Sequence, residues 1–203
     1  MFLETAAAVQ IAGDMDTHDE RAAISEAREL VVRARTGNRL AFEQLMMFFQ
    51  KPVLCMAMRL LHRHEDAKDA AQEVFLKLYR HLSRIQPESV RSWVYRVTVN
   101  VCRDMAKKNA NFSPIEPRIE VSAECPRVEA GIQLEQQRRI LQNALLELPF
   151  KERAALVLRD IEGLSTEDAA RILKSSETTV RSQISRGRVK VRQYCERALR
   201  RPK

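Results

Sequence analysis

The sequence predicts an all-α protein made of two small helical domains joined by a flexible linker. Three observations support this prediction. Glycine occurs only five times in 203 residues and aromatic residues make up 5%, which suits helices better than a sandwich or a barrel. Apolar residues recur at helical spacing on both sides of residues 109–137. Within that segment the spacing is lost and three of the seven prolines occur, which is typical of a linker.

The bulk composition limits the class of protein and its partners. Hydrophobic residues make up 45% of the chain, which is enough for a packed core. The net charge of +8 favours a polyanionic partner, but the charge alone does not choose among nucleic acid, a membrane surface and an acidic protein. The N-terminus has no basic residue ahead of its short apolar run, and no apolar run approaches the roughly 20 residues of a membrane span. We therefore expect a cytoplasmic protein without membrane insertion.

The first half of the chain predicts a tail and then a series of helices. Residues 1–24 are expected to form a flexible N-terminal tail, in which the stretch GDMDTHDER is polar and aperiodic. A helical stripe starts at Ser25 and ends near Gly37, and a second helix is expected from about Leu40 to Gln50. Pro52 fits the first turn of a third helix.

Residues 66–82 predict a strongly amphipathic helix, with a broad apolar face and a mixed opposite face. A leucine among charged residues on an outer face is compatible with an ordinary solvated surface and with a protein docking surface. The residues of this opposite face are Asp69, Gln72, Glu73, Leu76 and Arg80.

Residues 91–109 permit two structures. The stretch VTVNV alternates as a strand does, but the helical pattern extends over about 17 residues and the strand pattern over about six, so length favours the helix. On a helix, one polar stripe holds Arg96, Asn100, Arg103 and Lys107. The preceding residues 83–90 contain Pro87 and are expected to form a loop.

The C-terminal part predicts helices over residues 134–147, 150–161, 165–173 and 176–198. Ser165 and Asp168 form a capping-box-like start, and Ser176 can cap the helix that follows the turn. Two short helices with a tight turn and small residues at their crossing describe a helix-turn-helix, whose second helix enters the major groove of DNA. A basic amphipathic helix on a membrane or a partner protein is the alternative. The candidate DNA contacts on the second helix are Thr178, Thr179, Arg181, Ser182, Ser185 and Arg186. Farther along the helix, we expect contacts with phosphate or with the domain itself from Arg188, Lys190 and Arg192.

Two stretches resemble one protein family. The segment LPFKERAALVLRDIEGLSTEDAARILKSSETTVRSQISRGRVKVR resembles the promoter-binding C-terminal domain of a bacterial RNA polymerase sigma factor of the extracytoplasmic-function (ECF) group of the sigma-70 family. Independently, DAKDAAQEVFLKLYR and SWVYRVTVNVCRD resemble the sigma domain that holds the polymerase clamp and melts the promoter. Lys174 stands where the family's turn often has Gly, Gly187 where it usually has Ala, and Gln183 where a basic residue is frequent.

The resemblance implies a division of the chain and a role for each part. Residues 25–108 would form a sigma-two-like domain and residues 138–203 a sigma-four-like domain, with the tail 1–24 and the acidic linker 109–137 outside them. The face with Asp69, Gln72, Glu73, Leu76 and Arg80 would bind the clamp coiled coil of core RNA polymerase, and the C-terminal domain its flap. The minus-ten element would meet Arg96, Asn100, Arg103, Lys107 and Trp93, although Trp93 also suits a core position. The minus-thirty-five element would meet Thr178, Thr179, Arg181, Ser182, Ser185, Arg186 and Arg188.

The resemblance also adds an anti-sigma protein to the expected partners, beside core RNA polymerase and promoter DNA. Two other readings stay open on the residues alone: a stand-alone helix-turn-helix transcriptional regulator and a helical RNA-binding protein. The helix with DAKDAAQEVFLKLYR argues against a stand-alone regulator, because a sensory or dimerising domain does not need a clamp-like surface.

Enzyme chemistry is not indicated by any motif. The sequence has no Gly-rich phosphate loop, and it suggests no nucleophile paired with a base. His62 and His64 lack further ligands at metal-binding spacing, so we expect no metal, cofactor or catalytic residue. Cys55 and Cys102 lie in apolar helical runs and are expected as buried free thiols.

Overall fold

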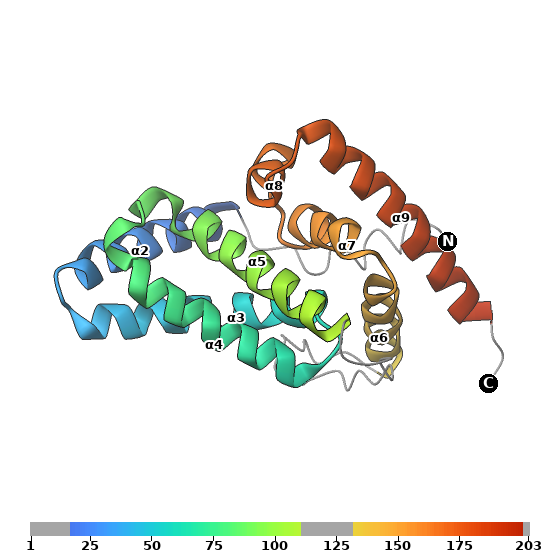
Figure 1. The fold of residues 1–203 in the computed structure, drawn as a ribbon, viewed down its shortest axis with the longest axis horizontal. Coiled ribbons are helices and arrows are strands. Elements are labelled where there is room, and N and C mark those ends of the chain that lie inside the picture. The colour runs from blue at the N-terminus through green and yellow to red at the C-terminus, as the bar shows by residue number, and fades with distance from the viewer. Residues whose placement is uncertain (1–16, 111–131, 201–203) are drawn as a thin grey trace.

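The computed structural model describes residues 17–110 and 132–200, and every regular element within these ranges is helical (Figure 1). The predicted all-α class is therefore confirmed for the described residues. We call the first group of helices the N-terminal module: α2 (Thr17–Arg35), α3 (Arg39–Leu60), α4 (His64–His81) and α5 (Val90–Ala110). The second group is the C-terminal module: α6 (Ile132–Leu146), α7 (Phe150–Leu156) with the π-helical turn η3 (Val157–Ile161), α8 (Thr166–Leu173) and α9 (Glu177–Arg200).

Helix α3 is the centre of the N-terminal module, because α2, α4 and α5 all pack against it. We expected two helices here, separated before Pro52, and this expectation was wrong: α3 runs through Pro52. An internal proline costs a helix about 3 kcal/mol. Residues on both sides of it belong to one buried stripe, which includes Leu45, Phe49, Val53 and Met56, and the burial of that stripe offsets the cost.

The ends of several elements differ from the sequence expectation. Helix α2 begins at Thr17, so residues 17–24, which we expected in a flexible tail, are helical. The run ERAAISEAREL consists largely of strong helix formers, which explains the earlier start. Helix α5 extends to Ala110 and α6 begins at Ile132, so both helices reach into the expected linker. Residues 1–16 of the tail and 111–131 of the linker lie outside the described residues.

Residues 90–110 form the helix α5, and the strand alternative for VTVNV was wrong. The buried Thr98 shows how a β-branched polar residue is accommodated there: its hydroxyl donates to the carbonyl of Val94 at 2.9 Å. The segment before α5 is not extended but forms two short 3₁₀ turns, η1 (Leu82–Arg84) and η2 (Pro87–Ser89). Arg35 of α2 holds this segment by donating to the carbonyls of Leu82, at 3.1 Å, and Ile85.

The C-terminal module is built around the contact between α7 and α9. Gly187 makes this contact possible. A Cβ atom at this position would lie 2.5 Å from Cδ1 of Leu156, so even an alanine would require Leu156 to shift. The absence of a side chain at Gly187 therefore lets the two helices approach closely.

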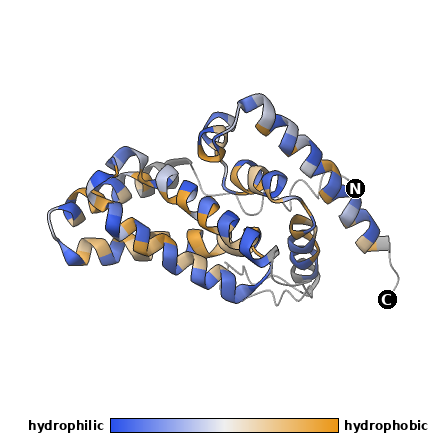
Figure 2. Ribbon diagram, viewed as in Figure 1, coloured by the Kyte–Doolittle hydropathy of each residue, from blue (hydrophilic) through white to orange (hydrophobic). Residues whose placement is uncertain are grey.

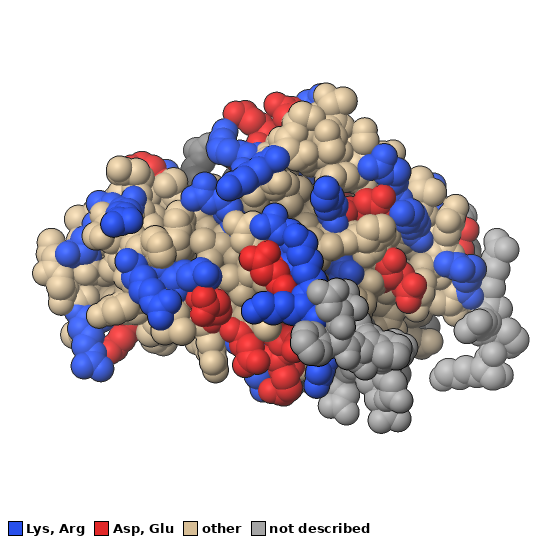
Figure 3. Space-filling model, viewed as in Figure 1, with Lys and Arg blue, Asp and Glu red and all other residues tan. Residues whose placement is uncertain are grey.

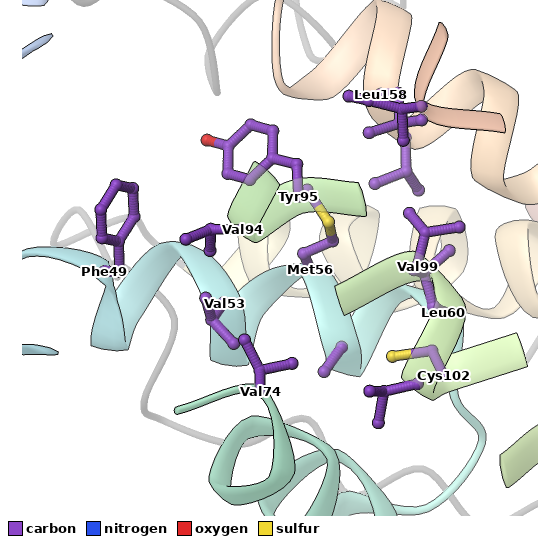
Figure 4. Packing of buried hydrophobic residues seen from close by; sticks show 14 of the residues in the cluster. Phe49, Val53, Met56, Leu60, Val74, Val94, Tyr95, Val99, Cys102 and Leu158 are labelled. Atoms are coloured by element: carbon purple, nitrogen blue, oxygen red, sulfur yellow. The ribbon is translucent and has the colours of Figure 1, made fainter. Parts of the chain in front are cut away.

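Apolar residues on the inner sides of the helices join the two modules in one continuous core (Figure 2). Figure 4 shows Leu158 from the C-terminal module pointing toward Tyr95 and Val99 of α5 and Leu60 of α3. Helix α8 lies against α5, and α6 and α7 lie against α3. The two groups of helices are therefore docked on each other.

The cysteines depart in part from the sequence expectation. Cys102 is a buried free thiol, as expected, and burial raises its pKa to about 12. Cys55 is also buried, but it is disulfide-bonded, so the expectation of a free thiol was wrong there. Cysteine spacing alone did not indicate that Cys55 is paired.

Replacing Lys174 by Gly should stabilise the protein. Lys174 ends α8 in the left-handed conformation, with φ 50° and ψ 52°, a conformation that costs a residue with a side chain about 1 kcal/mol. We expect Lys174→Gly to raise the midpoint of thermal unfolding by a few degrees. Lys174→Ala is the control, because it removes the charge and keeps the backbone strain. An equal gain from both variants would contradict the prediction.

Candidate functional site

Helices α8 and α9 form the helix-turn-helix that the sequence predicts. Ser165 caps α8 by accepting a hydrogen bond from the backbone N–H of Asp168 at 3.0 Å, and its hydroxyl donates to the Asp168 carboxylate at 2.7 Å. Ser176 caps α9 in the same way, accepting from the N–H of Thr179 at 3.2 Å. Both predicted caps are present, and Lys174 ends α8 in the left-handed conformation just before the turn.

The inner face of α9 is buried against the module and the outer face is open. Val180, Gln183 and Ile184 point inward and are buried. The departure of Gln183 from the family pattern therefore does not alter the open face. All seven residues predicted to contact the minus-thirty-five element are exposed: Thr178, Thr179, Arg181, Ser182, Ser185, Arg186 and Arg188.

The cationic side chains of α9 differ in the carboxylates with which they pair. Arg186 and Lys190 both bind the carboxylate of Glu152 on α7, at 3.2 and 2.8 Å, and the Glu152 side chain is only 10% exposed. Arg188 binds Asp160 through two hydrogen bonds of 2.8 and 2.6 Å, which raise the pKa of Arg188. Among the described residues, Arg181 pairs with Glu177, one turn away on the same helix. Arg186 and Lys190 thus attach α9 to α7, whereas Arg181 remains on the open face.

A hollow of about 430 Å³ lies beside the open face of α9, between this helix, η3 and the start of α8. Four arginines line it, Arg159, Arg181, Arg188 and Arg192, together with the hydroxyls of Thr166 and Ser185. Such a concentration of guanidinium groups is suited to bind phosphate oxygens. Sequence reasoning missed Arg159 and Thr166, because only folding brings them next to α9.

The residues predicted for the minus-ten element share one face of α5. Trp93, Arg96, Asn100 and Arg103 follow one another at helical spacing and are half-buried, and Lys107 at the end of the stripe is exposed. The Trp93 ring lies 6.0 Å from the ring of His81, measured between centroids, and packs against the core at its edge. Figure 3 shows that Lys and Arg side chains spread over one face of both modules, with acidic side chains between them.

Helix α4 presents the third predicted surface. Asp69, Gln72 and Arg80 are exposed, Glu73 is half-buried, and the Leu76 side chain is 49% exposed. Tyr79, which the sequence analysis did not select, is 67% exposed and packs edge-on against Phe42 of α3. Two large apolar side chains one turn apart on a largely polar helix form a surface suited to a protein partner.

Neither a metal centre nor a membrane span is found among the described residues. His, Cys, Asp and Glu do not gather there in threes. The helices of residues 17–110 and 132–200 also lack the length or apolar character that crossing a bilayer requires.

The comparisons with known proteins agree with this geometry. Residues 45–112 match the family model described as Sigma-70 region 2, and residues 138–191 match Sigma-70, region 4. The chain is 30% identical over 175 residues to the RNA polymerase sigma-H factor of Pseudomonas aeruginosa, covering 79% of this chain and 89% of that protein. It is 32% identical over 166 residues to the ECF RNA polymerase sigma factor SigM of Mycobacterium tuberculosis, covering 80% and 81%. The chain belongs to the ECF sigma factor family.

A solved structure supports the fold of this sigma factor. CnrH, in complex with the cytosolic domain of CnrY, superimposes with a TM-score of 0.63 and 25% identity, covering 84% of this chain and 97% of CnrH. The family resemblance inferred from the sequence is therefore confirmed.

Removing both cations that hold Glu152 should destabilise the C-terminal module. The double variant Arg186→Ala/Lys190→Ala leaves a largely buried carboxylate without these partners, which costs about 1–3 kcal/mol. We expect urea denaturation to show this loss. The double variant Arg181→Ala/Arg192→Ala removes the same charge from the open face of α9 and should stay within about 0.5 kcal/mol of the wild type. Equal destabilisation by the two double variants would contradict the assignment of Arg186 and Lys190 to the contact with α7 and of Arg181 to the open face.

Proposed function

We propose that this sigma factor binds core RNA polymerase and directs promoter-specific transcription initiation, with the minus-ten element bound by the N-terminal module and the minus-thirty-five element by the C-terminal module. The observation that carries this proposal is the presence, on one chain, of a helix-turn-helix with an open arginine-lined face and of a second module with a polar stripe and a protein-docking surface. A stand-alone regulator would need only the first. The proposed domains are residues 25–108 and 138–203, as expected from the sequence. The first turns of α2, from residue 17, are added to the N-terminal domain.

In the C-terminal module, the proposed base contacts come from the exposed first turns of α9. Five exposed residues of these turns have no hydrogen bond or ion pair to another helix among the bonds described above: Thr178, Thr179, Arg181, Ser182 and Ser185. Arginine reads guanine through two hydrogen bonds, and hydroxyls bind either bases or phosphates. We assign Arg188, Arg192 and Arg159 to the phosphates of the DNA backbone, because they line the hollow beside that face. Arg186 is assigned a structural role through Glu152.

In the N-terminal module, the stripe Arg96, Asn100, Arg103 and Lys107 would follow the strand of the minus-ten element, and Trp93 would stack at its end. The segment 83–90 would help to hold an unstacked base, whose extraction costs a few kcal/mol and is offset by stacking and pocket contacts. The face with Asp69, Gln72, Glu73, Leu76 and Arg80 would bind the clamp coiled coil. Tyr79 extends this face.

Binding, rather than bond-making, does this work, so no catalytic residue or cofactor is required. Family membership supports action in the cytoplasm, where RNA polymerase works. CnrH was solved with the cytosolic domain of CnrY. By analogy, we include an anti-sigma protein among the proposed partners. The other proposed partners are core RNA polymerase, including its flap, and promoter DNA.

Promoter-specific runoff transcription with purified core polymerase tests the function. The protein should co-purify with core polymerase and program it on some promoter sequences and not on others. Leu76→Asp should lose this association, because a charge enters the docking surface, whereas Val32→Asp, at an equally exposed apolar residue of α2, should retain it. Tight promoter binding by the protein alone, without any effect on core polymerase, would favour the stand-alone regulator.

Two arginine substitutions distinguish base contacts from phosphate contacts. Arg181→Ala should cost about 1–3 kcal/mol of discrimination between promoter and altered sequences. Arg192→Ala should weaken binding equally on all sequences and reduce the slope of log K against log salt by about 0.9. Filter binding or fluorescence anisotropy at several salt concentrations measures both effects. A uniform loss with Arg181→Ala would reassign that residue to phosphate.

A further inference from the structure

The π-helical turn η3 places two neighbouring residues of opposite charge beside α9. The N–H of Glu162 bonds to the carbonyl of Val157 at 2.9 Å, five residues back, which is the hydrogen bond of a π-helix. Within this turn Arg159 lines the hollow beside α9, and the next residue, Asp160, binds Arg188 of α9. Such turns are rare and frequently occur at functional sites. A carboxylate next to a surface assigned to DNA phosphates therefore calls for an explanation.

Asp160 holds Arg188 by two parallel hydrogen bonds. Nε of Arg188 donates to Oδ2 of Asp160 at 2.8 Å, and Nη2 donates to Oδ1 at 2.6 Å. A bidentate pair of this kind fixes the plane of the guanidinium group as well as its position. The group has five N–H donors, and Asp160 takes two of them. The remaining three, two of which are on Nη1, can bind a second anion.

The pair joins a largely buried carboxylate to an open guanidinium group. The side chain of Asp160 is 13% exposed, whereas that of Arg188 is 60% exposed and lines the hollow. A carboxylate with so little access to water needs a cationic partner. Arg188 therefore has its inner edge on Asp160 and its outer edge toward the hollow.

Arg181, another cation of the same hollow, is held less firmly. It makes a single bond of 2.7 Å to Glu177, and the two side chains are 67% and 44% exposed. Exposed pairs one turn apart on a helix are weak. The pair between Asp160 and Arg188 instead has two bonds, joins residues 28 positions apart and includes a carboxylate of low exposure. This pair is therefore the more rigid part of the surface.

Asp160 has two opposing effects on a phosphate that binds Arg188. Its negative charge offsets part of the attraction of the guanidinium group for the phosphate. In contrast, a side chain that is already immobilised loses less conformational freedom when it binds a ligand. Salt screens the charge effect over about 8 Å at physiological ionic strength, because Arg188 is exposed. The orienting effect is not screened and therefore dominates under these conditions.

We propose that Asp160 is a positioning residue of the DNA-binding face, which orients Arg188 so that the outer edge of its guanidinium group binds one backbone phosphate in the hollow. This proposal rests on the proposed function for the ligand, DNA, and on the geometry of the pair for the role of Asp160. Asp160 does not touch DNA itself, since phosphates repel its carboxylate. A fixed guanidinium group accepts a phosphate at one place only, so the pair helps to set the register of the protein on the duplex.

Substitution of Asp160 in the full-length protein bound to core RNA polymerase tests the sign of the effect. The probe is a promoter duplex that the wild-type holoenzyme transcribes, and fluorescence anisotropy measures its affinity. We expect Asp160→Ala to weaken binding about three- to tenfold, because Arg188 loses its orientation, although the variant carries one more positive charge. Tighter binding by Asp160→Ala would overturn the proposal, because the charge effect would then dominate.

A matched control removes the same charge from the helix-turn-helix without touching the hollow. Glu167 of α8 pairs with Arg171, both side chains are well exposed, and neither residue lines the hollow. Glu167→Ala should leave the affinity within about twofold of the wild type. A loss as large as that of Asp160→Ala would overturn the specific role of Asp160.

A double-mutant cycle shows whether Asp160 acts through Arg188. In the Arg188→Ala background, Asp160→Ala should no longer weaken binding, because there is no guanidinium group left to orient. Equal weakening by Asp160→Ala in both backgrounds would exclude an action through Arg188 and overturn the proposal.

Uncharged phosphates locate the contact. Methylphosphonates that replace one phosphate at a time should reveal a position where the wild type loses affinity and Arg188→Ala does not. At that position the loss should be smaller for Asp160→Ala than for the wild type, with the other positions unchanged. Because positions are compared within one variant, the fraction of folded protein does not affect the result. The absence of such a position, or a change at all positions alike, would indicate a merely structural pair and overturn the proposal.

The outcomes separate this proposal from the proposed function. If the wild type fails to program core polymerase, the same cycle is measured with the full-length protein alone on a short duplex of arbitrary sequence. A coupled loss of affinity there supports the role of Asp160 while the proposed function is overturned. Uncoupled effects on a duplex that the holoenzyme transcribes overturn the role of Asp160 and leave the proposed function in place.

Discussion

The buried guanidinium group of Arg153 joins the two modules. It donates to the carbonyls of Leu60 at the end of α3 and Leu148 just beyond α6. Burial lowers its pKa to about 10, so the group remains a cation at neutral pH. Because the negative ends of two helix dipoles meet at this cation, it is stabilised without a hydrogen-bonded carboxylate. Arg153 also fixes the start of α7, and η3, Glu162 and α8 follow from there along the chain. Arg153 therefore contributes to the position of the helix-turn-helix, together with the shared apolar core.

The sequence predicted those parts of the molecule that depend on local pattern. The helices of the C-terminal half and the caps Ser165 and Ser176 follow from spacing and residue type within a few positions. The polar stripe of α5 follows from helical periodicity. The helix break expected before Pro52 was wrong, because the burial of apolar side chains on both sides of Pro52 outweighs the local preference of proline against a helix interior. That burial is a tertiary effect.

The parts that the sequence did not predict depend on residues far apart in the chain. The pairing of Arg186 with Glu152, 34 residues earlier, could not be predicted, because it exists only when α9 packs on α7. The sequence likewise did not indicate the ion pair between Arg59 and Glu162, which lie 103 residues apart. The net charge of +8 likewise indicates the sign of a partner's charge but not which cations contact it, because cations such as Arg186 and Lys190 pair with carboxylates within the fold. Local sequence patterns thus predict the helices, whereas packing decides which of their cations pair within the fold.

Pro52 divides α3 into two stretches with different partners. Because proline has no N–H, the carbonyl of Phe48 lacks its donor in the helical ladder, and the two stretches are joined by one bond fewer than usual. The second stretch carries Arg59 and Leu60, which meet the C-terminal module, while the first faces α2 and α4 with residues such as Phe42. The end of α3 therefore depends for its stability on its burial and on the donors Gln142 and Arg153 of the C-terminal module, in place of an unbroken helical ladder.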